Sequence, residues 1–300
     1  GLFTPRFSAQ STTCPIAIPL AVLNQELSFS LLTAWLIPLY GFVGMLVSLP
    51  WAAGLFRRVA HRPAAYLNIL LTLLAFVHGS LILQEVFQSG PVDLSYPWLT
   101  VADLELDISF SLSLTNLVAL ELITGLSLFS QVYSLGYMDK EWALARFFAL
   151  LGFFEGAMSG VVLSDSLFQS YFLLEMLTLS TYLLVGFWYA QPLVITAARD
   201  AFLTKRVGDV LLLMGVVALC SFAGGMGFND LYAWAATDSL SPLAATLLGL
   251  GLIAGPMGKC AQFPMHLWLD EAMEGPNPAS ILRNSVVVTC GAIVLLKVMP

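Results

Sequence analysis

The chain has 300 residues, of which 58% are hydrophobic and 10% charged, with a formal net charge of −7 and a mean hydropathy of +0.85. Soluble domains carry about 25% charged residues, so these values exclude a soluble globular protein and favour a single membrane domain. The chain has no basic stripe of the kind that binds nucleic acid. Its cysteines lie far apart without a CxxC pair, which argues against a zinc site or a disulfide framework and favours small buried filler: Cys14, Cys220, Cys260 and Cys290.

Residues 1–28 are polar and contain prolines, and we interpret them as an irregular lead-in outside the membrane. A bilayer span needs about 20 mostly apolar residues, and the rest of the chain contains eight such segments. They cover approximately residues 31–55, 66–88, 114–136, 144–163, 167–190, 207–226, 243–262 and 277–299. The sequence therefore predicts an all-α polytopic membrane protein with about eight transmembrane helices.

A stretch between the second and third spans has the pattern of a β-strand. Apolar and polar side chains alternate with a period of two over residues 101–113, as in a half-buried strand. Together with the preceding DLSYPWLT, this stretch predicts a small β-hairpin on the outer face. An extended loop is the alternative.

The distribution of basic residues between the connections predicts the orientation in the membrane. Acidic residues dominate the second, fourth and sixth connections, which contain no lysine or arginine. The positive-inside rule places the other connections on the cytoplasm-like side, with the N-terminus opposite. In this interpretation, Lys205 and Arg206 anchor the sixth span and Asp209 lies in its first turn. The basic residues of the odd-numbered connections are Arg57, Arg58, Arg62, Lys140, Arg146, Arg199, Lys205 and Arg206.

Two ionisable residues lie deep inside apolar segments, Glu175 in the fifth span and Lys259 in the seventh. A charge at the centre of a membrane helix costs ~2.5–3.5 kcal/mol on insertion scales, so such residues mark polar paths or have partners. Burial favours the neutral form of each group, and an opposite charge favours the ionised form. We interpret Glu175 as a proton carrier controlled by Lys259. The alternative is a structural ion pair that joins two helices.

Helix breakers surround Lys259 in the segment GLGLIAGPMGKCAQFP, which contains Pro256 and Pro264. Proline kinks a helix and frees a backbone carbonyl, and interrupted helices at mid-membrane mark binding sites in ion-coupled transporters. We expect the seventh span to be interrupted and consider the eighth a second candidate for interruption. His266 follows the break, where it could relay protons or cap a re-entrant turn.

Further ionisable residues occur in three other spans. Glu121 and Glu155 could extend a polar path or meet a partner subunit. Arg283 lies about one turn into the eighth span with Asn284 beside it. A pair between Arg283 and an acidic residue such as Glu274 is the structural alternative to a role in the path.

Four segments resemble the antiporter-like subunits of complex I and of Mrp antiporters: SLGYMDKEWALARFFALLGFF, LLEMLTLSTYLLVGFW, AFLTKRVGDVLLL and GKCAQFPMHLWLDEAMEGPNPAS. The similarity covers about residues 30–300 and is strongest to the NdhF type, the fifth chain of type-I NAD(P)H dehydrogenases. It implies that Glu175 and Lys259 are the fifth-span glutamate and seventh-span lysine of a proton half-channel. It also implies a fold of about sixteen spans in two inverted repeats. This chain would hold three N-terminal helices with the outer hairpin (29–136) and the first repeat (137–300).

The sequence departs from the family pattern at a few positions. The family usually has a histidine at the position of Asn284, a small or apolar residue at Arg283 and a proline at Asp270. These changes resemble the variant NdhF subunits of cyanobacterial carbon dioxide uptake complexes. The resemblance implies a thylakoid membrane protein among other membrane subunits, with a carbon dioxide-hydrating partner on the cytoplasmic face. Because a guanidinium stays charged, we expect Arg283 to be a gate and not a proton carrier.

We expect no redox chemistry in this chain and assign it no catalytic, cofactor-binding or metal-binding residue. It has no cysteine cluster for iron–sulfur and no dinucleotide fingerprint. Flavin, iron–sulfur and quinone chemistry would then lie elsewhere in a complex of the NAD(P)H–plastoquinone oxidoreductase type. Three alternatives stay open: an ordinary respiratory or cyclic-electron-flow NdhF subunit, a cation/proton antiporter subunit, and a passive membrane scaffold.

Overall fold

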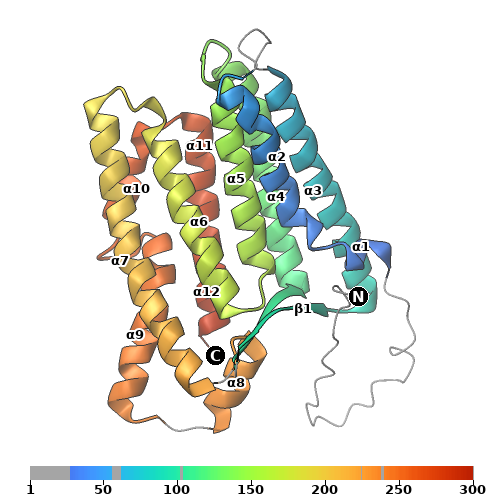
Figure 1. Ribbon diagram of the computed structural model, residues 1–300, viewed down its shortest axis with the longest axis vertical. Helices are drawn as coiled ribbons and strands as arrows, with labels where there is room; N and C mark the ends of the chain where they lie inside the picture. Colours follow the sequence, from blue (N-terminus) through green and yellow to red (C-terminus); the bar gives the residue numbers. More distant parts are fainter. Residues whose placement is uncertain (1–27, 56–61, 102–103, 224, 238–239, 300) are drawn as a thin grey trace.

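The structure is a computed structural model that describes residues 28–55, 62–101, 104–223, 225–237 and 240–299; the predicted lead-in lies outside this part except for Ser28. Figure 1 shows a bundle of helices that run roughly along its long axis, with a β-hairpin at one end. Six helical segments are long and apolar enough to cross a membrane. They are α3 (Arg62–Ser89), α4 (Leu114–Tyr137), α5 (Leu144–Leu163), α6 (Leu167–Val185) with the 3₁₀ turn η2 (Gly186–Trp188), α7 (Pro192–Ala223) and the segment Asn277–Val298.

The remaining two predicted spans also form helices. The first is divided into α1 (Phe29–Leu32) and the 17-residue apolar helix α2 (Leu36–Ala52). The seventh is the 18-residue helix α9 (Pro242–Lys259). The all-α membrane fold is therefore confirmed. A short helix that was not predicted, α8 (Phe228–Thr237), follows α7.

The helix of the seventh span continues through Pro256 and is followed by a turn. Helix α9 ends at Lys259, and the chain then turns into the short helix α10 (Leu267–Glu271) and the 3₁₀ turn η3 (Ala272–Glu274). The eighth span stays helical, but a π-helical turn, η4 (Leu282–Val286), separates α11 (Asn277–Ile281) from α12 (Val287–Val298). Such turns occur frequently at functional sites.

Small residues let α2 pack directly on α5 near the centre of the bundle. A Cβ atom added at Gly41 would lie 2.4 Å from the backbone nitrogen of Gly156, and one added at Gly156 would lie 2.8 Å from the carbonyl of Pro38. Membrane helices gain little from hydrophobic burial against each other, so close backbone packing at small residues drives their association. Almost all of α5 is buried.

The predicted hairpin is present and forms part of a junction at one end of the bundle. Strand β1 (Val92–Val101) pairs antiparallel with β2 (Leu104–Leu112). In the linker between α5 and α6, Asp165 donates its backbone N–H to the carbonyl of Ser109, at 3.0 Å, and accepts the N–H of Phe228, at 3.1 Å. The hairpin, this linker and α8 therefore lie together (Figure 1).

The predicted odd-numbered connections meet at the opposite end of the bundle. Arg62, at the start of α3, forms an ion pair with Asp139, which follows α4. Arg146, in the first turn of α5, donates from Nη2 to the carbonyl of Phe187 at 2.7 Å, at the end of α6. Consecutive connections thus alternate between the two ends.

The predicted start of the sixth span is wrong. Helix α7 begins at Pro192, so Lys205, Arg206 and Asp209 lie near its middle and not in a connection or a first turn. Lys205 and Asp209 are buried and contact side chains of α6, α9 and α10, whereas Arg206 is 46% exposed and pairs with Glu175 of α6. An orientation that counts Lys205 and Arg206 as loop residues therefore overstates the positive charge of that connection.

The alternation of connections predicts opposite labelling of its two ends. In a background without the native cysteines, Lys140→Cys and Asp107→Cys are each exposed and should react with a membrane-impermeant maleimide from opposite sides of sealed vesicles. Labelling of Lys140→Cys is expected from the cytoplasmic side because of the flanking basic residues. Reaction of both positions from the same side would contradict this topology.

The hairpin junction contains the carboxyl group of Asp165, whose pKa is raised from its usual value. Burial raises the pKa of Asp165 to about 6 from the usual 3.8, with Asp93 and Asp230 acting in the same direction and Lys297 against it. The folded chain therefore binds this proton more tightly than the unfolded chain. Its contribution to stability is largest below the unfolded pKa and is lost as pH rises from about 4 through about 6.

Asp165→Asn is expected to raise the free energy of unfolding at pH 7.5 by up to about 3 kcal/mol, since two pKa units correspond to roughly that amount. The gain should shrink toward pH 4, where the wild-type carboxyl is already protonated in the fold. Thermal unfolding of the detergent-solubilised protein at both pH values measures the difference. Equal destabilisation of the variant at both pH values would contradict this account.

Candidate functional site

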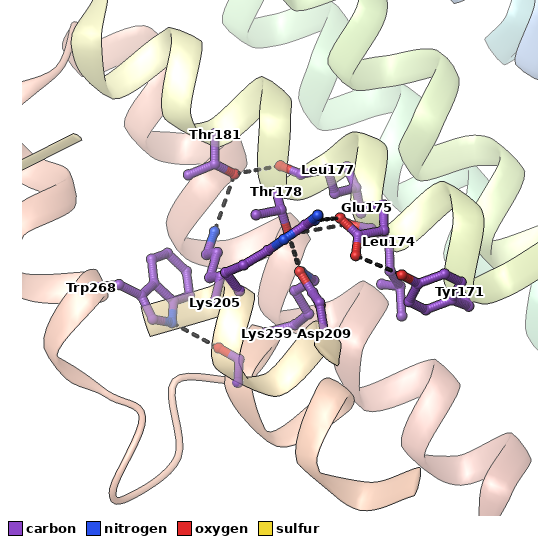
Figure 2. A network of polar contacts seen from close by, with 12 residues as sticks. Tyr171, Leu174, Glu175, Leu177, Thr178, Thr181, Lys205, Asp209, Lys259 and Trp268 are labelled. Atoms are coloured by element: carbon purple, nitrogen blue, oxygen red, sulfur yellow. Dashed lines mark hydrogen bonds and ion pairs between the residues drawn. The ribbon is translucent and has the colours of Figure 1, made fainter. Parts of the chain in front are cut away.

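A buried ion pair joins the interrupted end of α9 to the middle of α7. Lys259 Nζ lies 2.7 Å from both carboxylate oxygens of Asp209, and each side chain is only 1% exposed. Thr178 of α6 donates its hydroxyl to Asp209 Oδ2 at 2.6 Å and accepts a hydrogen bond from Lys259 Nζ. Figure 2 shows these groups pointing toward one another between three helices.

Glycines bring α9 close enough to α7 for this contact. A Cβ atom added at Gly208 would lie 2.7 Å from the carbonyl of Ala254, and one added at Gly255 would lie 2.6 Å from Leu212 Cδ2. Ending α9 at Lys259 also suits the lysine, because a cation at a helix C-terminus interacts favourably with the helix dipole. The glycines and the break together set the position of the ammonium.

Glu175 pairs with Arg206 and not with Lys259. The Glu175 carboxylate contacts the Arg206 guanidinium, with side chains 19% and 46% exposed respectively, and accepts the Tyr171 hydroxyl at 2.9 Å. The predicted direct control of Glu175 by Lys259 is therefore wrong. Glu175 and Lys259 each have a partner of opposite charge. Both partners, Arg206 and Asp209, lie on α7, about one turn apart.

The sequence contained a signal for the partners on α7. Small or apolar residues recur every three or four positions before the charges, at Val194, Ala198 and Ala201, and the series continues into Lys205 and Asp209; all five are buried in the structure. This is the pattern of one helix face, and it places Lys205 and Asp209 on the buried side of a single long helix.

Lys205 is a second buried lysine that the sequence analysis interpreted as an orientation anchor. Its side chain is fully buried, and Nζ donates to Thr181 Oγ1 at 3.1 Å. The ammonium also lies 3.5 Å from the centroid of the Trp268 ring, whose Nε1 donates to the carbonyl of Gly258 at 2.7 Å. Within the described part of the chain, Lys205 has no carboxylate within ion-pair distance.

His266 lies outside this cluster. It occupies the N-cap position of α10, is exposed, and stacks on Phe263 with ring centroids 5.8 Å apart. Its side chain makes no capping hydrogen bond, so the capping alternative is not observed. The role of His266 as a proton relay stays a prediction.

Arg283 and Asn284 lie in the π-helical turn η4, also outside the cluster. Arg283 is fully buried, and its Nη2 donates to Ser280 Oγ at 2.7 Å, whereas Nε and Nη1 have no partner among the described residues. The alternative of a salt bridge to Glu274 is wrong. Asn284 Nδ2 lies 3.7 Å from the sulfur of Met273. A buried guanidinium without a carboxylate is unusual, because breaking up or omitting a buried ion pair is costly.

Glu155 and Glu121 belong to polar contacts among α3, α4 and α5. Glu155 is fully buried and accepts the hydroxyls of Thr72, at 3.4 Å, and Ser159, at 3.5 Å. Glu121 accepts the hydroxyl of Ser80 at 3.0 Å, and its other carboxylate oxygen is buried without a partner. Neither carboxylate has an ion-pair partner among the described residues, and they sit on other helices than the Asp209–Lys259 pair.

Two family profiles match the chain. The family "NADH:quinone oxidoreductase/Mrp antiporter, TM" matches residues 164–300, and "NADH-Ubiquinone oxidoreductase (complex I), chain 5 N-terminus" matches residues 98–148. The chain is 75% identical over 280 residues to an NAD(P)H-quinone oxidoreductase subunit 5 of the organellar chromatophore of Paulinella chromatophora, an alignment that covers 93% of this chain and 45% of that protein. It is 33% identical to the chloroplastic subunits 5 of Agrostis stolonifera and Hordeum vulgare, covering 89% of this chain and 37% of each.

These matches and the helical membrane fold place the chain among the antiporter-like membrane subunits. The chain belongs to the NdhF-type family, subunit 5 of NAD(P)H-quinone oxidoreductases. It is a multi-pass membrane protein and spans less than half the length of the relatives just described.

Proposed function

We propose that this chain translocates protons as a membrane subunit of an NAD(P)H–quinone oxidoreductase complex, through Glu175, Arg206, Asp209 and Lys259. The observation on which the proposal rests is the buried Asp209–Lys259 pair at the interrupted end of α9. Electron transfer would occur on other subunits, which hold the flavin, iron–sulfur and quinone sites. By analogy with its relatives, the complex would lie in a thylakoid-type membrane.

The two ion pairs suggest how a proton is moved. Arg206 and Asp209 lie about one turn apart on α7, so Arg206 can exchange Glu175 for Asp209 with little backbone movement. Once Arg206 neutralises Asp209, the Lys259 ammonium loses its carboxylate in a low-dielectric site and is driven to release its proton. At the same time, Glu175 loses its cation and can take up a proton. One change of partner thus couples uptake at Glu175 to release at Lys259.

The finer proposal is that the complex supports carbon dioxide uptake, with a hydrating partner subunit on the cytoplasmic face. It is supported by the resemblance of ILRNSVVV to that variant and by the state of Arg283, which is buried and has no acidic partner among the residues that the structure describes. A permanent cation holds nearby carboxylates ionised and opposes the return of a proton. Arg283 would therefore act as a gate, with Asn284 as a neutral neighbour. An ordinary NdhF subunit and a cation/proton antiporter subunit are the competing functions.

Glu175→Gln, Asp209→Asn and Lys259→Met are each expected to abolish proton pumping. Since an unpaired buried charge costs about 3–5 kcal/mol, the double variant Asp209→Leu with Lys259→Met serves to keep assembly intact while removing both charges. Pumping is measured by dye quenching in membrane vesicles, and assembly by the amount of complex on native gels. Arg62→Gln, which removes an exposed pair, is the matched control and should pump normally. Wild-type pumping in Lys259→Met would favour the passive scaffold.

Arg283→Ile with Asn284→His should restore the usual family pattern and lower carbon dioxide uptake more than electron flow. The physical reason is that a titratable imidazole replaces a fixed positive charge, so protons can return toward the hydration site. Both activities are measured in the same cells. Unchanged uptake would show that the two positions are packing variants without a role in coupling.

A further inference from the structure

Lys205 is a buried lysine that the proposed proton path does not use. A lysine at membrane depth is costly without a partner, and here the ammonium is held by one hydroxyl and one aromatic face. The Trp268 ring contributes only while Lys205 is charged, because a cation–π contact is an attraction between a cation and the ring quadrupole. The contact between Lys205 and the Trp268 ring therefore depends on the charge of Lys205 as well as on packing.

The charges around Lys205 place it in competition with Lys259. Lys205 and Asp209 are four residues apart on the same face of α7, while Lys259 holds both oxygens of that carboxylate. Lys259 and Arg283 repel the Lys205 charge, and Asp209 attracts it. While Lys259 occupies Asp209, Lys205 is left with its hydroxyl and its aromatic face. When Lys259 withdraws, Asp209 is open to Lys205 and to Arg206, which both lie about one turn before it on α7.

Trp268 connects this competition to the break in α9. One face of its indole covers the Lys205 ammonium, and its N–H binds the carbonyl of Gly258, directly before Lys259. The last carbonyls of a helix lack their usual partners; the Gly258 carbonyl accepts the backbone N–H of Ala261 at 3.4 Å, and the indole adds a shorter hydrogen bond to it. Figure 2 shows the Trp268 ring beside Lys205.

We propose that Lys205 is a positioning residue that competes with Lys259 for Asp209, and that Trp268 transmits the charge of Lys205 to the interrupted end of α9. With Lys205 charged, the indole is held and the Gly258 carbonyl stays bonded. With Lys205 neutral, the ring is released and the break loosens around Lys259. This inference rests on the proposed function, because it assigns the control of the same Asp209–Lys259 pair.

Two substitutions separate a charge effect from a packing effect. Lys205→Met keeps the approximate length of the side chain and removes the charge, whereas Lys205→Arg keeps the charge in a larger group. Lys205→Met is expected to lower the pumping rate at least fivefold and to raise amide exchange over residues 258–268 about tenfold in the assembled complex. Lys205→Arg should retain at least half of the rate, with exchange within twofold of wild type. The reverse order, a normal methionine variant and an impaired arginine variant, would overturn the proposal.

Trp268 variants give an independent test in case Lys205→Met does not assemble. Trp268→Leu removes the ring face and the N–H, and should raise the same amide exchange, whereas Trp268→Phe keeps a ring face and should raise it less. Normal exchange in Trp268→Leu would also overturn the proposal. If Lys259→Met pumps normally, the proposed function fails, whatever Lys205 does. If Lys259→Met is inactive while Lys205→Met is normal in pumping and exchange, only the role of Lys205 fails.

Discussion

The structure depends on how ionised side chains are stabilised away from water. Isolated charges in a bilayer cost several kcal/mol, and an ion pair repays that cost only with good geometry and further hydrogen bonds. Helix α7 meets this condition by presenting Arg206 and Asp209 to Glu175 and Lys259. Hydroxyls of α6 provide the additional hydrogen bonds. The helices around this seam are positioned by their charges as much as by apolar packing.

The end of α9 at Lys259 and the close packing of glycines bring the Lys259 ammonium to its partners on α6 and α7. A continuous helix would place Lys259 within a hydrogen-bonded turn of fixed direction, whereas ending the helix there gives the ammonium access to α6 and α7. Gly208 and Gly255 remove the Cβ atoms that would hold α7 and α9 apart. The carbonyl of Gly258, at the end of α9, accepts hydrogen bonds from Trp268 and from the backbone of Ala261, in keeping with the rule that backbone groups at membrane depth need a protein or water partner.

Glu155 and Glu121 show that burial of a carboxylate does not by itself indicate an ion pair. These groups lie on α5 and α4 and accept hydrogen bonds from hydroxyls. At the hairpin junction, outside the spans, burial raises the pKa of Asp165 to about 6. Among the described residues, the ion pair whose two side chains are both buried, Asp209–Lys259, lies where α6, α7 and α9 meet.

The sequence by itself determined the membrane class, the eight helical segments, the hairpin and the break at Lys259, because length, apolar content, period-two alternation and proline placement act locally. It also identified Glu175 and Lys259, since a charge within an apolar run stands out in any fold. Only the tertiary structure decided which charges meet. The start of α7 at Pro192 places Lys205, Arg206 and Asp209 near the middle of the helix, where Lys205 and Asp209 are buried, and not in a connection or a first turn. Pairing depends on helix rotation and depth, which the packing of neighbouring helices sets and which local composition does not contain.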